Sequence, residues 1–113
     1  MHKTLATLAM LSVATAAIAQ DEATKLSGSL RITSKSWGDP PPGEKKDRVG
    51  FFLTGASAKR IYDAMPGKAV PGCEEGMRHK EAGNLDCSKD SDGYVCTFGI
   101  MLTNGQSRPY GSC

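Results

Sequence analysis

The sequence predicts an α+β fold, in which a small antiparallel sheet of about five or six strands carries one α-helix packed on one face. Three observations support this prediction. Residues 55–67 have the apolar spacing of a helix, and segments on both sides of them have the alternation typical of strands. Turn signals then follow at short intervals, which favours a meander over βαβ units. These signals are Gly83-Asn84, Asp92-Gly93 and Asn104-Gly105.

Residues 1–19 have the pattern of a cleaved secretory signal peptide. Lys3 lies in a short positive start, an apolar run follows, and Ala17-Ile18-Ala19 is an A-x-A cleavage site. The apolar run is too short to act as a stable membrane span. We therefore expect cleavage between Ala19 and Gln20, a periplasmic or secreted protein without a membrane anchor, and a single disulfide-stabilised domain of residues 20–113.

The composition of the predicted mature chain argues against several classes of partner. Without Lys3, the 14 Lys and Arg residues fall to 13 against 12 Asp and Glu, so the formal net charge is +1. Charges of both signs are interspersed, which leaves no basic stripe for nucleic acid and no polybasic patch for a membrane. A chain of this size forms one modest core, and exported domains of this kind often depend on disulfides.

The first half of the chain predicts two strands, a loop and the helix. Residues 26–37 alternate so that Leu30 and Ile32 share one face of a strand. Three prolines prevent regular structure in residues 38–47 and hold an extended, stiff loop. Residues 49–54 are apolar on both faces, which is typical of a central strand, and the helix then ends at Pro66-Gly67.

The second half predicts the remaining strands as a meander. Residues 77–81 and 85–89 form strands separated by Gly83-Asn84, and residues 94–102 alternate as a strand of the terminal hairpin.

Four cysteines predict two disulfides, because the count is even, the chain is exported and no C-x-x-C spacing is present. If Asn104 and Gly105 are the central residues of a type I′ turn, Cys96 lies opposite Cys113 in a non-hydrogen-bonded pair. This geometry predicts a Cys96–Cys113 bond and, by elimination, a Cys73–Cys87 bond. The alternative pairs Cys87 with Cys96 and Cys73 with Cys113.

The residues do not assemble a recognisable catalytic motif. Ser57 follows a strand and a glycine, as in a nucleophile elbow, but the second glycine of G-x-S-x-G is absent. Helix capping by Thr54 or Ser57 explains the same residues. His79 is the only histidine after the signal segment and lies in a polar segment that we expect to be a solvated strand face.

The sequence also predicts neither a metal nor a cofactor. Asp90, Asp92 and Gly93 resemble the start of a calcium loop, but the first ligand and the bidentate glutamate are missing at their spacing. A hairpin turn explains these residues.

Two features favour a binding protein. Trp37 opens onto the triple-proline loop that contains Pro41, and a stiff loop loses little conformational entropy on binding; packing of Trp37 into the core is the alternative. The terminal hairpin presents Arg108 and Tyr110. These four residues are the predicted partner-binding residues.

We therefore expect a monomeric exported binding protein rather than an enzyme. The leading hypothesis is an inhibitor or immunity-type protein that acts on another protein of the cell envelope, such as a cell-wall-active enzyme. The alternatives are a small envelope hydrolase that uses Ser57 or His79, and a structural or solute-binding envelope component.

Overall fold

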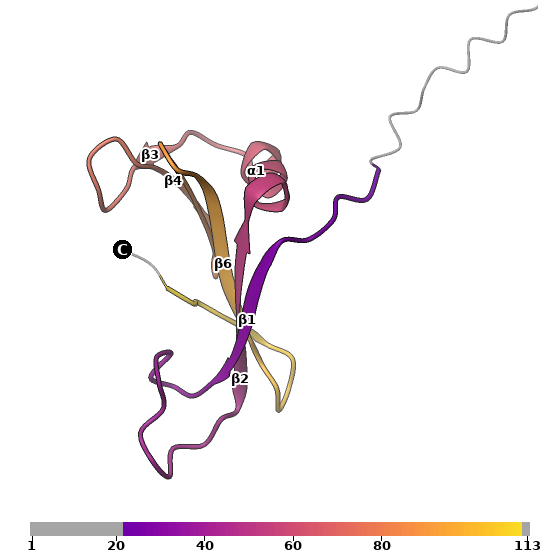
Figure 1. Ribbon diagram of the computed structural model, residues 1–113, viewed down its shortest axis with the longest axis vertical. Helices are drawn as coiled ribbons and strands as arrows, with labels where there is room; N and C mark the ends of the chain where they lie inside the picture. Colours follow the sequence, from indigo (N-terminus) through magenta and orange to yellow (C-terminus); the bar gives the residue numbers. More distant parts are fainter. Residues whose placement is uncertain (1–21, 112–113) are drawn as a thin grey trace, which may run out of the picture.

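The computed structural model describes residues 22–111, so the predicted signal peptide and Cys113 lie outside the described residues. The fold is a small α+β domain in which one helix packs on an antiparallel sheet, and this confirms the predicted class (Figure 1). The elements in chain order are β1 (Gly28–Thr33), β2 (Arg48–Thr54), α1 (Gly55–Ala64), β3 (Val70–Pro71), β4 (Arg78–Ala82), β5 (Leu85–Asp90), β6 (Gly93–Met101) and β7 (Ser107–Arg108).

The strands form one sheet in the order β1-β2-β6-β5-β4-β3, and every pair is antiparallel. Strand β2 lies between β1 and β6, as its apolar residues predict. Strand β6 is long enough to pair with β2 along one side and with two strands in succession along the other. Its first part pairs with β5, and Gly99 and Ile100 pair with β7.

Helix α1 forms where the sequence predicts it and places Ala58, Tyr62 and Met65 in the core. Pro66 follows the C-cap residue Met65, so the helix does not continue. The Lys80 ammonium donates hydrogen bonds to the carbonyls of Tyr62 and Met65 at 3.0 and 3.1 Å, which satisfies acceptors at the helix C-terminus. The core cluster comprises Leu53, Ala58, Tyr62, Met65, Cys87 and Cys96.

The helix covers only one end of its sheet face. Ten residues of helix extend about 15 Å, whereas the nine residues of β6 extend about 30 Å. Figure 1 shows α1 at one end of the sheet and the β1–β2 loop at the other. The part of the apolar face beyond the helix is therefore open to solvent on β1, where Leu30 is 60% and Ile32 46% exposed.

The β5–β6 turn lies one residue earlier than predicted, and this shifts the pairing of the two strands by two residues. Asp90 pairs with Gly93, so Ser91 and Asp92 are the central residues of the turn. The side-chain Oδ1 of Asp90 accepts a hydrogen bond from the Asp92 N–H at 2.7 Å, which stabilises the turn at this position. Cys87 consequently lies opposite Cys96, whereas the predicted register placed it opposite Phe98.

The β6–β7 connection is longer than the predicted two-residue turn. The Met101 N–H donates to the Gln106 carbonyl at 2.8 Å, so four residues, 102–105, form the loop. Gly105 adopts a φ of 73°, and the Asn104 side chain accepts a hydrogen bond from the Gln106 N–H. The Asn-Gly signal is present, but it lies at the end of a four-residue loop.

These registers correct the predicted disulfides. Cys87 is bonded to Cys96 across β5 and β6, with Cα atoms 4.1 Å apart. The predicted Cys96–Cys113 and Cys73–Cys87 bonds are therefore wrong. The physical reason is the register, because a cross-strand bond requires directly opposite residues and the turns place Cys87 at that position.

Candidate functional site

Two glycines create a flat recess on the sheet face opposite α1. Gly50 of β2 and Gly99 of β6 lie directly opposite each other and are buried. A Cβ atom on Gly50 would lie 2.5 Å from the Tyr110 ring, and one on Gly99 would lie 2.4 Å from the Trp37 ring. Both rings therefore pack directly on the backbone of the sheet, where any side chain would displace them.

Trp37, Tyr110 and Arg48 form a cluster over this recess, which we call the aromatic platform. The centroids of the two rings are 5.0 Å apart, and the guanidinium carbon of Arg48 lies 5.3 Å from the Trp37 ring centroid. These distances are typical of aromatic pairing and of a cation–π contact. The platform joins the β1–β2 loop to the C-terminal segment.

Three of the four predicted partner-binding residues thus lie near the Gly50–Gly99 pair. Trp37 and Tyr110 are half-buried, and Arg108 lies opposite Gly99 on β7 with an exposed side chain. Pro41 is exposed in the loop that Trp37 opens. Trp37 packs against the sheet, but its side chain is only half-buried. Its position therefore lies between the two alternatives predicted from the sequence, which are display on the loop and packing into the core.

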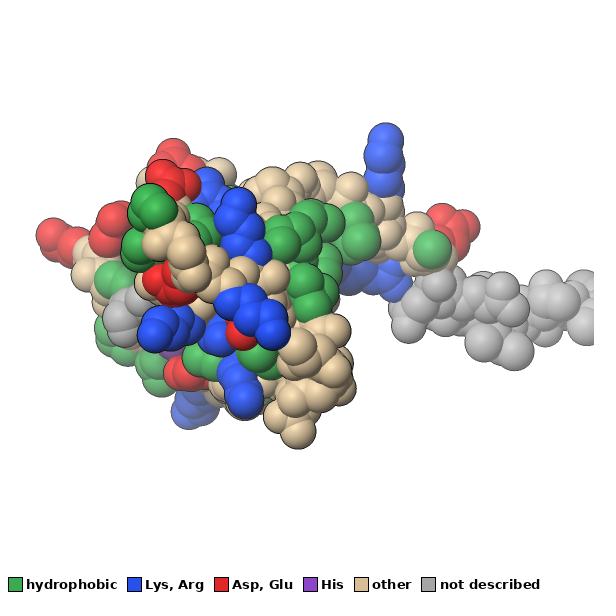
Figure 2. All heavy atoms as spheres, turned by 90° about the horizontal axis from the view of Figure 1, so that it is seen from below, with side chains coloured by type: hydrophobic (Ala, Val, Ile, Leu, Met, Phe, Trp, Pro, Cys, Tyr) green, Lys and Arg blue, Asp and Glu red, His purple; other side chains and the backbone are tan. Residues whose placement is uncertain are grey.

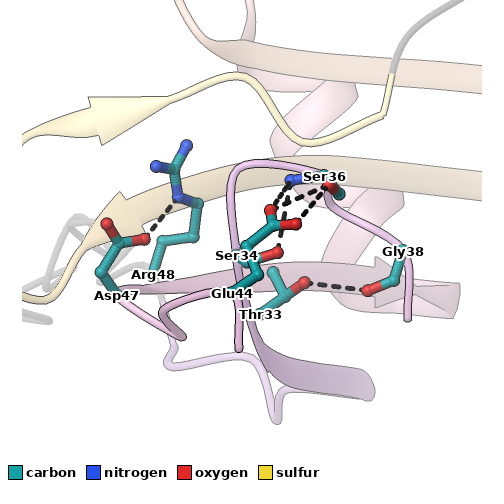
Figure 3. Close-up of polar contacts among 7 residues, drawn as sticks. All are labelled: Thr33, Ser34, Ser36, Gly38, Glu44, Asp47 and Arg48. Carbon is teal, nitrogen blue, oxygen red and sulfur yellow. Dashed lines mark hydrogen bonds and ion pairs between the residues drawn. The ribbon is translucent and has the colours of Figure 1, made fainter. Parts of the chain in front are cut away.

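The loop of residues 34–47 is held by its own hydrogen bonds (Figure 3). The Glu44 carboxylate accepts hydrogen bonds from the Ser36 hydroxyl at 2.8 Å and from the Ser36 N–H at 3.2 Å. Hydrogen bonds from the Ser34 and Ser36 hydroxyls hold the pKa of Glu44 below its ordinary value. These hydrogen bonds join the two sides of the loop within the chain itself.

Two further contacts fix the ends of the loop. The Thr33 hydroxyl, which is fully buried, donates to the Gly38 carbonyl at 3.0 Å. At the other end, Arg48 Nε lies 2.9 Å from Asp47 Oδ1, and this contact holds the pKa of Asp47 below its ordinary value.

Trp37 itself has an unusual backbone conformation. Its φ is 56°, and among the described residues it is the one non-glycine residue with a positive φ. For a bulky residue this left-handed conformation is unfavourable, so its surroundings must impose it. The packing of the ring on Gly99 and the bond from the Trp37 N–H to the Ser34 carbonyl at 3.0 Å do so.

The Ser57 side chain is engaged in hydrogen bonds to the backbone. It is almost fully buried, donates to the Thr54 carbonyl at 2.8 Å and accepts from the Ser27 N–H at 3.2 Å. Neither Thr54 nor Ser57 caps a helix N–H through its side chain, so the capping prediction is wrong. Ser57 instead fastens the start of α1 to the segment that precedes β1.

His79 is more enclosed than the sequence indicates. Its side chain is 14% exposed, and its Nδ1 lies 2.8 Å from Oδ1 of Asp86, so the prediction of a solvated strand face is wrong. Burial raises the pKa of Asp86, Glu81 adds to this rise, and His79 opposes it. The pair lies at a hollow of about 210 Å³ on the face opposite α1. The structure therefore does not bring Ser57 and His79 together.

The described residues 22–111 show no group of three or more His, Cys, Asp or Glu side chains arranged to hold a metal ion. In the same part of the chain, no helix combines the length and the apolar character that a membrane span requires.

The chain is thus a small disulfide-bonded α+β protein. Its candidate interaction surface is the aromatic platform with the β1–β2 loop beside it. Comparison with known proteins adds no relative: no family model, no curated protein and no solved structure matches the chain.

Proposed function

We propose that this chain is an exported binding protein of the inhibitor or immunity type, which acts on another exported protein such as a cell-wall-active enzyme. The main support for this proposal is the aromatic platform together with the loop of residues 34–47 beside it. Aromatic and arginine side chains dominate the binding energy of many protein interfaces. Here, Trp37 contacts both Tyr110 and Arg48.

The rigidity of the loop supports binding over a purely structural role. A loop that is already ordered loses little conformational entropy when a partner binds. Glu44 and Thr33 hold the loop internally, while Pro41 projects into solvent. The unfavourable φ of Trp37 adds to this argument, because such conformations cluster at ligand-binding sites.

The charges near the platform favour an acidic partner surface. Glu44 and Asp47 are engaged by hydroxyl groups and by Arg48, whereas Lys45, Lys46 and Arg108 are exposed. Figure 2, which looks at the end of the molecule where the loop lies, shows Lys and Arg side chains near the middle of this end, with Asp and Glu side chains among them and along one side. Complementary charge accelerates association and excludes partners of the same sign.

Copurification tests this proposal. Tagged mature protein is incubated with envelope extract of the producing organism, and captured proteins are identified by mass spectrometry. We expect stoichiometric capture of one exported protein, which Arg108→Glu abolishes because it reverses an exposed charge beside the platform. Lys68→Glu is the matched control, since Lys68 is also exposed but lies after α1. Equal capture by both variants, or no capture, would contradict the proposal.

A second candidate is the small envelope hydrolase, and one observation favours it. The contact between His79 and Asp86 resembles a base with its orienting carboxylate, and it lies at a hollow. Hydrolysis of p-nitrophenyl acetate by the purified protein, lost in His79→Gln with unchanged folding, would support this candidate. If the wild-type protein hydrolyses the ester no faster than the His79→Gln variant does, the hydrolase candidate is excluded.

A further inference from the structure

Strand β1 is an open edge of the sheet, and it is the longest one in the described residues. It pairs with β2 alone, whereas the opposite edge strand, β3, has two residues and includes Pro71. Strand β7 is equally short and is followed by Pro109. Short strands and prolines protect an edge from pairing with another chain, and β1 has neither protection.

The hydrogen bonds of β1 show which backbone groups face outward. The Thr54 N–H donates to the Ser27 carbonyl at 3.0 Å, and these residues lie opposite each other in the β1–β2 register. In an antiparallel pair every second residue bonds to its neighbour. Ser29 and Arg31 therefore bond to β2, and the N–H and C=O groups of Leu30 and Ile32 point away from the sheet.

The side chains of the same two residues are also unusually open. Leu30 and Ile32 are on the apolar face and are 60% and 46% exposed, and the nearby Leu26 is 70% exposed. An apolar strip beside unpaired backbone groups is typical of a surface that receives another strand.

We propose that a second copy of this chain pairs with β1 in an antiparallel arrangement, with the two-fold axis at Leu30. In this register Leu30 of each copy faces Leu30 of the other, and Ile32 faces Gly28 of the other copy. Gly28 has no side chain, so it leaves room for Ile32 on the apolar face. The dimer continues the sheet across both copies and departs from the monomer expected from the sequence.

The charge of Arg31 disfavours one of the two neighbouring registers. With Leu30 on the axis, Arg31 faces Ser29 of the second copy. Moving the axis to Arg31, which is one of the two shifts that keep the apolar faces together, would instead place Arg31 opposite Arg31, and this is unfavourable. Asp39 lies 3.6 Å from Arg31 and offsets its charge. The interface lies along β1 and leaves the aromatic platform for the proposed partner.

Sedimentation equilibrium of the exported protein tests the proposal. In the micromolar range we expect twice the mass of one chain. For Leu30→Glu we expect the dissociation constant of the dimer to be at least about tenfold higher. Phe52→Glu is the matched control, because Phe52 is similarly exposed but lies on the opposite face of β2. A wild-type protein that sediments as one chain overturns the proposal, as does equal weakening by both variants.

A backbone test separates strand pairing from general apolar contact. Ile32→Pro removes an outward N–H without removing a bond to β2, whereas Ile32→Ala keeps the N–H and loses the side chain. We expect Ile32→Pro to dissociate the dimer more than Ile32→Ala does. Hydrogen exchange followed by NMR gives a second readout: the amides of Leu30 and Ile32 should gain protection as concentration rises. Concentration-independent exchange at both amides overturns the pairing.

Discussion

Cys87 and Cys96 face each other across β5 and β6 with their Cα atoms 4.1 Å apart, and the bond between them lies in the core under α1. The side chains of both residues are completely buried. The bond therefore fastens two central strands of the sheet, in contrast to the predicted link to the C-terminal edge.

The first prediction concerns the disulfide map. Peptide mapping without reductant should find Cys87 linked to Cys96 and, because four cysteines then leave one pairing, Cys73 linked to Cys113. Cys73 and Gly111 line the same hollow, which supports this second link. Deleting Cys113 should therefore release a thiol at Cys73 and leave Cys96 bonded. A thiol at Cys96 in that variant would contradict the register described above.

The second prediction concerns the strength of the Cys87–Cys96 bond. Replacing both cysteines with alanine should lower the free energy of unfolding by about 2–3 kcal/mol in the chain-entropy model, since the bond closes a short loop. Urea denaturation of the variant measures the loss. A change within the error of the wild-type value would show that the sheet needs no cross-link at this position.

The third prediction uses Trp37 as a reporter of the aromatic platform. Gly99→Ala places a methyl group where the Trp37 ring lies, so we expect a loss of about 1–3 kcal/mol and a shift in tryptophan fluorescence. Trp37 is the one tryptophan of the chain, so the signal has a single source. Gly38→Ala is the control, because its added Cβ meets one atom at 3.9 Å. Equal effects of the two variants would argue against the described packing.

The fourth prediction concerns the end of α1. Lys80→Met keeps most of the apolar stem and removes the two hydrogen bonds to the carbonyls of Tyr62 and Met65. We expect a loss of about 1–2 kcal/mol in the free energy of unfolding, measured in urea. Lys68→Met, at an exposed position, should change stability little. If the two variants are equally stable, the ammonium of Lys80 does not stabilise the helix end.

The fifth prediction follows from the raised pKa of Asp86. Because burial raises this pKa, the folded protein keeps the Asp86 proton at pH values where the unfolded chain has lost it. The contribution of Asp86 to stability is therefore most favourable below its ordinary pKa of 3.8 and falls as pH rises through the raised pKa. Asp86→Asn should remove this fall. Stability curves in acid that are parallel for wild type and variant would contradict the assignment.

Local patterns predict the elements of this fold better than their pairing. The helical spacing of Ala58 and Tyr62 and the apolar character of β2 are local signals, so both elements lie where they are expected. The register depends on which residues occupy a turn, and Asp90 and Asn104 shift both hairpins through their side-chain hydrogen bonds. A two-residue shift was sufficient to exchange the partner of Cys96.

The candidate site was predictable only in part. The sequence marks Trp37, Arg108 and Tyr110 as side chains for binding, but it does not show that Trp37 and Tyr110 contact each other, because that contact depends on tertiary packing over Gly50 and Gly99. The enclosed pair of His79 and Asp86 likewise arises from the β4–β5 register.

Site-specific crosslinking in the producing organism is the sharpest test of the proposal that the aromatic platform binds a partner. A photoreactive amino acid is placed at Pro41, an exposed residue of the loop that contains Trp37, and at Lys68, an exposed control position after α1. After irradiation, we expect one discrete adduct with an exported protein from position 41 and none from position 68. No adduct from position 41, or the same adduct from both positions, would contradict a binding surface at the platform.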